Sequence, residues 1–594
     1  MADLNNPLFT CTPKRRIGLW LLIILFFSAT ALAAKPLTYK INGLDKALKQ
    51  NATLYLDNLP TIKPKQFNEY RHEIREALQN SLMALGYYQP TIEFNRSKKP
   101  PNQLSININP GQPVIIKSVQ IDLAGDAEKD RAFKRLIKQN PLRVGDVLND
   151  GKYESLKTEL NNLAITRGYF DAELVEHQIN VYPARHGADI VLTIKSGRRY
   201  TFGPVIYDDS VTETTRELLN TIIHPVINGE QGQKYRSEKL SQLNMDFSAT
   251  GYFKSIEVRP LKDQAVDGEI PIFVSVIPKT AWELETGIGF STDEGPRVSL
   301  SIDKPWMDEK GHSFTSDLKV SGEVNELSGR YKIPYGNPLL EYYSLDGGYQ
   351  RTMVQNTDSQ LVSASINKWK KRPGNWDQDF FIRVEYEDYT QGLQNSSSLL
   401  LIPGMSFDRR KAVGNPMDPR SGSLYNVKIE TSARAWQSDA DFIKIWGRAK
   451  WLTTFYQHHR FISRVEQGAI WVDEIKNIPP SIRFFTGGDQ TIRGYSYESI
   501  SPRDSSDQLT GGLYLSVASV EYNYDIFDNW RIAFFVDSGT ATNAYKKDQV
   551  EWKTGVGPGI RWITPLGPLR LDFAFAVSDP GSPWRIHFSM GPDL

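Results

Sequence analysis

The second half of the chain alternates apolar with polar or small residues along many short runs. Residues 380–387, 571–577 and 584–590 show the alternation most clearly. Because neighbouring side chains of a strand point to opposite faces, each run predicts a strand with one apolar and one polar face. Such strands are typical of a membrane β-barrel, whose outer face meets lipid while its inner face meets water. A soluble β-sandwich would give the same local pattern.

The length of this region sets the expected number of strands. Residues 280–594 span 315 positions, and at roughly 20 residues per strand and connection this gives about 16 strands. An even number is expected in a bacterial barrel, and closure removes the exposed edges that so many strands would otherwise leave. We therefore predict a C-terminal transmembrane antiparallel β-barrel over residues 280–594.

A different pattern, helix followed by strand, occurs three times before the barrel. Three glycine-aromatic triplets recur at intervals of 82 and 83 residues: Gly86-Tyr87-Tyr88, Gly168-Tyr169-Phe170 and Gly251-Tyr252-Phe253. Each follows apolar residues eight and four positions before its glycine, which lie on one face of a helix. Glycine suits the end of that helix because it adopts the left-handed conformation at little cost.

The repeats predict three small α+β domains in series, at residues 34–112, 113–200 and 201–279. Strands with a period of two, such as 190–194, follow the predicted helices. The triplets are interpreted as structural. Any functional surface is expected at the sheet edges, where unpaired backbone groups can accept an extended segment by strand addition.

The first 33 residues have the pattern of a secretory signal. Basic residues at 14–16 precede an apolar run at 18–27, and small residues at 31–33 supply a cleavage site. An uncleaved membrane anchor is the alternative interpretation. The chain's single cysteine, Cys11, lies in this segment, so the mature protein is expected to have no thiol chemistry.

Charge and motifs argue against two other classes of protein. The chain has 70 basic and 69 acidic side chains, without the basic excess of a nucleic-acid binder. The sequence has neither a G-x-S-x-G nor an H-E-x-x-H motif. We therefore predict a protein that is not an enzyme, with no catalytic residues, no metal site, no cofactor and no nucleic-acid partner.

One segment of the barrel region, residues 483–495, breaks the alternation. It is rich in glycine and polar residues and predicts a long loop. Downstream, the strand 535–539 can turn Asp537 inward, and glycines at alternate positions of 555–559 leave one strand face without side chains. We predict that the loop folds into the lumen and that Arg493 binds Asp537, because a guanidinium can hold a carboxylate through two bonds.

These residues carry a resemblance to a known family. The run Ile492, Arg493, Gly494 and Tyr495 resembles the (V/I)RG(F/Y) motif of the BamA/TamA superfamily, in which the sixth extracellular loop enters the barrel. Phe535, Asp537 and Gly539 resemble its FxDxG partner strand, and Glu521 is a second possible partner for Arg493. The resemblance is to the TamA branch in particular. It is carried by the three repeats, by residues 290–296 at the start of the barrel, and by residues 86–94 and 591–594.

The resemblance implies POTRA (polypeptide-transport-associated) repeats of β-α-α-β-β type and a 16-stranded barrel whose first and last strands pair weakly. It also implies an outer-membrane location with periplasmic N-terminal domains. The expected partners are a TamB-like protein anchored in the inner membrane, outer-membrane lipid, and client outer-membrane proteins such as autotransporters. The expected lateral gate comprises Trp282, Leu284, Gly287, Gly289, Trp584, Ile586 and Phe588.

Two alternatives share parts of this description. A two-partner secretion transporter has the arginine loop but typically two POTRA domains and a plug helix, and a full BamA carries five POTRA domains. A passive outer-membrane pore explains the barrel and leaves three periplasmic domains without a purpose. The count of three repeats therefore favours the TamA branch, and an assembly or secretion role for β-barrel clients.

Overall fold

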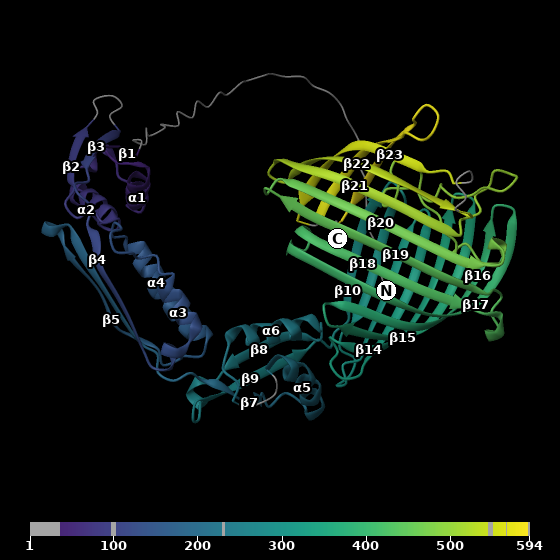
Figure 1. Ribbon diagram of the computed structural model, residues 1–594, viewed down its shortest axis with the longest axis horizontal. Coiled ribbons are helices and arrows are strands. Elements are labelled where there is room, and N and C mark those ends of the chain that lie inside the picture. The colour runs from purple at the N-terminus through teal and green to yellow at the C-terminus, as the bar shows by residue number, and fades with distance from the viewer. Residues whose placement is uncertain (1–35, 97–101, 228–231, 545–549, 566, 592–594) are drawn as a thin grey trace, which may run out of the picture. The chain divides into compact units, whose positions relative to one another are not determined.

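The computed structural model describes residues 36–96, 102–227, 232–544, 550–565 and 567–591 (Figure 1). The predicted secretory signal at residues 1–33 lies outside the described residues. Within those ranges, no helix is both long enough and apolar enough to cross a lipid bilayer. The chain forms two compact units, one with the first two small sheets and one with the third small sheet and the large sheet.

The first small domain packs two helices on a three-stranded sheet. Its elements are β1 (Thr38–Asn42), α1 (Lys46–Asp57), α2 (Arg71–Met83), β2 (Thr91–Arg96) and β3 (Gln103–Asn109). The order is β1-β3-β2, with β1 parallel and β2 antiparallel to β3. Ile74, Leu78 and Leu82 lie four residues apart on α2 and are fully buried, because this spacing places all three on the face toward the sheet.

The second and third domains repeat this arrangement. The second has β4 (Ile115–Ala124), α3 (Arg131–Lys138), α4 (Asp150–Thr166), β5 (Glu173–Tyr182) and β6 (Gly187–Lys195). The third has β7 (Thr201–Tyr207), α5 (Glu213–Ile227), α6 (Ser237–Ala249), β8 (Phe253–Pro260) and β9 (Glu269–Pro278). Gly86, Gly168 and Gly251 have φ angles of 90°, 83° and 72° and lie within three residues of the ends of α2, α4 and α6. The predicted β-α-α-β-β fold is confirmed.

The large sheet has 16 antiparallel strands in sequence order and curls into a nearly closed barrel (Figure 1). The strands are β10 (Glu283–Ser291), β11 (Gly295–Lys304), β12 (Ser313–Ser321), β13 (Val324–Pro334), β14 (Glu341–Val354), β15 (Thr357–Arg372), β16 (Trp376–Gln391), β17 (Gln394–Asn415), β18 (Asp418–Ser432), β19 (Phe442–Phe455), β20 (His459–Val472), β21 (Tyr514–Phe527), β22 (Trp530–Thr542), β23 (Lys553–Thr564), β24 (Gly567–Ala576) and β25 (Trp584–Met590). The predicted strand number is confirmed.

The two faces of the barrel wall differ as the alternation predicts. Phe534 and Val536 of β22 are 55% and 51% exposed. Phe535, which lies between them, and Asp537, which follows Val536, are buried. The outward positions of β22 thus carry apolar side chains, whereas its buried polar group, Asp537, points inward.

One barrel turn packs into the core of the third domain. Trp306, in the turn between β11 and β12, is buried against Tyr252 and Phe253, with ring centroids 5.1 and 5.5 Å apart. Asn337, in another turn, donates to the Thr221 carbonyl at 3.1 Å. The turns on this side of the barrel therefore face the third domain, and the turn after β10 lies at the opposite end.

Candidate functional site

A long segment between β20 and β21 occupies the barrel interior. We call residues 473–513 the lumen loop. The loop folds on itself through backbone bridges between Phe484 and Gly512 and between Thr486 and Ile500. Apolar side chains of the loop join inward residues of the wall in one buried cluster, which includes Leu400, Ile402, Ile478, Ile482, Phe484, Ile492, Tyr495, Ile500, Leu515 and Val517. The loop and the wall therefore share one hydrophobic core inside the barrel.

Arg493, near the middle of the lumen loop, binds Asp537 of β22 through two parallel contacts. Its Nε donates to Oδ2 of Asp537 at 2.7 Å and its Nη2 donates to Oδ1 at 3.0 Å. The backbone N–H of Arg493 also donates to Oδ2 at 3.1 Å. Asp537 is completely buried, and the guanidinium carbon lies 3.5 Å from the ring centroid of Phe535. The carboxylate is thus satisfied by both the side chain and the backbone of the loop.

The same guanidinium contacts two further carboxylates. Nη1 donates to Oε2 of Glu521 on β21 at 2.6 Å and to Oδ2 of Asp572 on β24 at 3.2 Å. Burial opposes the charged form of Arg493, but the carboxylates of Asp537 and Glu521 outweigh it and raise the pKa of the arginine well above its ordinary value. Arg493 therefore stays charged and connects three strands, β21, β22 and β24, to the loop.

A second arginine completes the network. Arg561 of β23 donates to Glu521 at 2.9 Å and forms an ion pair with Asp572 at 2.7 Å. Ser519 donates to Oδ1 of Asp537 at 2.6 Å. Because each buried carboxylate has a cationic partner, the arrangement avoids the free-energy cost of an unpaired buried charge.

Close backbone approach explains the glycines of β23. A Cβ atom on Gly555 would lie 1.7 Å from the carbonyl oxygen of Arg493, and a Cβ on Gly494 would lie 3.1 Å from the backbone nitrogen of Ala576. Gly494 also has a φ of 97°, which favours glycine. The loop backbone therefore lies directly on the inner surface of β23 and β24.

The structure brings the eight predicted lumen residues together. Ile492 and Tyr495 are buried in the loop cluster, and a Cβ on Gly539 would lie 3.0 Å from Cδ1 of Ile492. The remaining members are Arg493, Gly494, Glu521, Phe535 and Asp537. Sequence analysis did not identify Arg561, Asp572 and Ser519. Their only signal in the sequence was that they occupy inward-facing positions of alternating strands. Alternation does not say which inward residues of different strands lie at the same height in the barrel.

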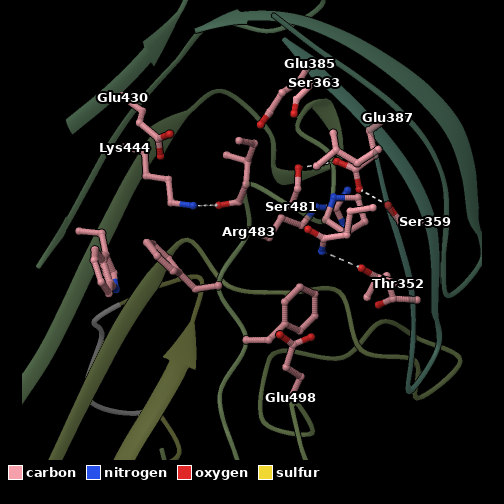
Figure 2. A pocket seen from close by; sticks show the side chains of 18 of the residues that line it. Thr352, Ser359, Ser363, Glu385, Glu387, Glu430, Lys444, Ser481, Arg483 and Glu498 are labelled. Carbon is pink, nitrogen blue, oxygen red and sulfur yellow. Dashed lines mark hydrogen bonds between the residues drawn. The ribbon is translucent and has the colours of Figure 1, made fainter. Parts of the chain in front are cut away.

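The base of the lumen loop is held separately, on the opposite wall. A cavity of about 630 Å³ lies here, lined by loop residues and by strands β14, β15, β16, β18, β19, β20 and β21. Figure 2 shows side chains that line it. Glu387 of β16 accepts hydrogen bonds from Ser359 at 2.6 Å and from Ser481 of the loop. Lys444 of β19 donates to the Ile482 carbonyl at 2.8 Å. The loop is therefore attached to two walls of the barrel.

Few hydrogen bonds connect the two ends of the sheet, β10 and β25. The Thr292 N–H donates to the Phe588 carbonyl, and the Phe588 N–H donates to Oγ1 of Thr292, each at 3.2 Å. The Phe290 and Phe588 rings lie 5.9 Å apart. Among the described residues no strand pairing joins β10 to β25, whereas all of β16 pairs with β17. We call this junction the seam.

The seven predicted gate residues lie on or beside the two strands of the seam. Phe588 makes the hydrogen bonds across it. Trp584 stacks on Phe573 of β24, at 4.8 Å and 25°, and Trp282 packs against Phe314 of β12. Leu284 is 65% exposed, Ile586 is 47% exposed, and Gly287 and Gly289 face Ser299 and Arg297 of β11. Trp282 and Trp584 therefore pack toward their own neighbouring strands.

Comparison with known protein families gives three matches. The Omp85 superfamily domain matches residues 278–593. A family described as POTRA domain TamA domain 1 matches residues 38–110, and the POTRA family described as surface antigen variable number repeat matches residues 114–197.

Individual relatives are distant. The outer membrane protein assembly factor BamA of Nitratidesulfovibrio vulgaris is 23% identical over 493 residues, which cover 78% of this chain and 61% of that protein. The factor of the same name from Neorickettsia risticii is 20% identical over 465 residues, 73% of this chain and 60% of that protein. The chain thus spans about three fifths of the length of these relatives.

A solved structure shares the fold. The structure of BamA from Haemophilus ducreyi lacking POTRA domains 1–3 superposes with a TM-score of 0.62 at 14% identity. The superposition covers 80% of this chain and 99% of that one.

Proposed function

The chain belongs to the Omp85 superfamily, and on that premise we propose that it is an outer-membrane factor that inserts or secretes β-barrel clients. The relatives named above are outer membrane protein assembly factors. The proposal places the barrel in the outer membrane and the three α+β domains, residues 34–112, 113–200 and 201–279, in the periplasm.

The seam is the observation that carries this proposal. Strands β10 and β25 end the sheet, and hydrogen bonds between Thr292 and Phe588 join them. A strand edge in a bilayer is costly because lipid cannot satisfy its N–H and C=O groups. An edge that opens toward lipid therefore favours pairing with an incoming client strand, by the same strand addition that extends other sheets.

We further propose that the chain acts as a member of the TamA branch. The match of residues 38–110 to a POTRA family described for TamA supports this choice, as does the count of three small domains. On this proposal the clients are outer-membrane β-proteins such as autotransporters. The small domains bind a TamB-like partner anchored in the inner membrane, and Trp282, Leu284, Gly287, Gly289, Trp584, Ile586 and Phe588 form the lateral gate.

Site-specific photocrosslinking tests the proposal. A photoreactive amino acid is placed at Ile288 of β10 or at Ile586 of β25, and at Val384 of β16 as a control. All three side chains are exposed on the outer face. Nascent barrel proteins are expected in crosslinks from the first two positions and absent from the third, as read by mass spectrometry. Equal capture at Val384, or no client at either seam position, would contradict the proposal.

A further inference from the structure

The lumen loop extends beyond the arginine network and contacts both ends of the barrel sheet. On the β10 side, the Asp489 N–H donates to Oδ2 of Asp293 in the β10–β11 turn at 2.7 Å. On the β25 side, the Gly494 N–H donates to Nε2 of His587 at 2.9 Å, and Arg585 donates to Oγ of Ser496 at 2.6 Å. One continuous stretch of eight loop residues, 489–496, therefore bridges the seam.

The hydrogen bonds that connect the two strands through the loop are shorter than the direct ones. The two hydrogen bonds between Thr292 and Phe588 are 3.2 Å long, whereas the three through the loop are 2.6–2.9 Å long. The loop thus adds a second connection across the seam, made of shorter hydrogen bonds.

Asp293 lies in a closely fitted position between the loop and the last strand. Its side chain is 7% exposed, and its Oδ1 lies 4.0 Å from Nδ1 of His587. Gly488 packs on the carboxylate so closely that a Cβ atom there would lie 2.4 Å from Oδ2. Gly488 also has a φ of 111°. The turn and the loop therefore fit each other only with glycine at position 488.

The two sides of this bridge are unequal. On the β25 side, the loop is held by His587 and Arg585 and by the Arg493 network on the adjacent strands β21 to β24. On the β10 side, the attachment nearest the seam is at Asp293, which accepts a hydrogen bond from Asp489 and packs on Gly488. Loss of that contact would leave the loop with the last strands while freeing β10.

We propose that Asp293 is a positioning residue that fastens the lumen loop to the first barrel strand, so that the seam opens when this fastening is released. The inference rests on the proposed function, because it assumes that the seam is where clients enter. The inference adds a residue of the β10–β11 turn to the gate. Opening of the seam then requires a contact between this turn and the lumen loop to break, as well as the hydrogen bonds between the strands.

The test measures the width of the seam in the full chain, in lipid bilayers, without a client. Spin labels are attached to cysteines introduced by Ile288→Cys and Ile586→Cys, and their distance distribution is recorded by pulsed electron paramagnetic resonance. Asp293→Ala is expected to shift the ratio of wide to narrow distances by about tenfold, the effect of leaving the Asp489 N–H without its acceptor. Asp293→Asn keeps an acceptor for Asp489 and is expected to restore the narrow distances.

The matched control is Glu294→Ala. Glu294 lies in the same turn, and its ion-pair partners are Lys319 and Arg297, so its loss should leave the distances unchanged. Gly488→Ala approaches the same contact from the loop side and should widen the seam even where Asp293→Ala impairs folding. Unchanged distances in both Asp293→Ala and Gly488→Ala would overturn the inference. So would equal widening by Glu294→Ala.

The outcome for the seam is separable from the outcome for the proposed function. Asp293→Ala without widening, combined with client crosslinks at Ile288, overturns this inference and leaves the proposed function intact. Widening in the variant without client crosslinks at Ile288 supports the fastening and contradicts the proposed function.

Discussion

Arg493 and Asp537, 44 residues apart in the chain, form a two-pronged ion pair with a shortest contact of 2.7 Å. Asp537 is fully buried, and the arginine's backbone N–H adds a third contact to the same carboxylate. Because Glu521 and Asp572 bind the remaining amino group of the guanidinium, one loop side chain links strands β21, β22 and β24. This one cation therefore anchors the lumen loop to three strands of the wall.

Arg493→Ala is expected to release the lumen loop. Removing the guanidinium leaves Asp537 without its cationic partner in a buried site, at a cost of about 3–5 kcal/mol. The loop should become sensitive to added protease in intact outer membranes, and client assembly should fall. Arg503→Ala is the control, since Arg503 is in the same loop, its side chain is 47% exposed, and it contacts Asp507, which lies only four residues away in the chain. Wild-type protease resistance in Arg493→Ala would contradict the structural role of the ion pair.

Gly555→Ala should reproduce much of this effect without removing a charge. A Cβ at position 555 would lie 1.7 Å from the carbonyl oxygen of Arg493, so the loop must move or the wall must bend, at about 1–3 kcal/mol for overpacking. Gly447→Ala on β19 is the matched control, because its nearest neighbour would be 3.5 Å away. Heat modifiability on gels and loop proteolysis measure the change. Equal behaviour of the two variants would mean that loop and wall are not in tight contact.

The contact at Asp293 is expected to weaken as pH rises. Burial and the neighbouring carboxylate of Asp489 raise the pKa of Asp293 to about 8. When folding raises the pKa of a carboxyl group, the protonated group stabilises the folded state. This stabilisation is complete below the ordinary pKa of the group and is lost as pH rises through the pKa in the folded state. The titratable groups that face Asp293 include Asp489, Glu323 and His587. The pKa of Asp489 is itself raised by burial.

Widening of the seam should therefore increase from about pH 4 to about pH 8 and level off above that. The spin-label distances between positions 288 and 586 measure it. Asp293→Asn, which cannot ionise, should flatten the pH profile. This variant also separates Asp293 from Glu498 of the same loop, whose pKa burial raises to about 7. A profile that keeps its slope in Asp293→Asn would assign the transition to another group.

The alternation of the second half predicted the wall of the barrel because lipid and water impose opposite demands on its two faces. Leu571 and Phe573 turn outward and Asp572 turns inward for that reason alone. The sequence also placed Arg493 and Asp537 in recognisable motifs. It did not identify Arg561 or His587, because their roles depend on the register that sets each strand against the next. That register places Asp537 opposite Gly555 and Asp572 opposite both Gly559 and His587.

The lumen loop shows a further limit of pattern reasoning. Glycines and polar residues in 483–495 indicated an irregular segment, yet Ile492 and Phe484 form a buried apolar cluster with the wall. Such a cluster has no period, because its side chains come from a loop and from several strands. Only tertiary structure assembles it.

Trp306→Ala is expected to loosen the third α+β domain from the barrel without disturbing the lumen loop. Trp306 is 5% exposed and packs against Tyr252 and Phe253, and replacing a buried tryptophan by alanine costs about 3–5 kcal/mol. Cleavage near residues 279–282 by added protease should accelerate, while the loop stays resistant and heat modifiability is retained. Trp436→Ala, at a site that is 44% exposed, serves as the control.

If Trp306→Ala also released the loop, the third domain and the loop would be coupled through the barrel wall. Unchanged cleavage would mean that the domain is held mainly by other contacts, such as that of Asn337 with Thr221.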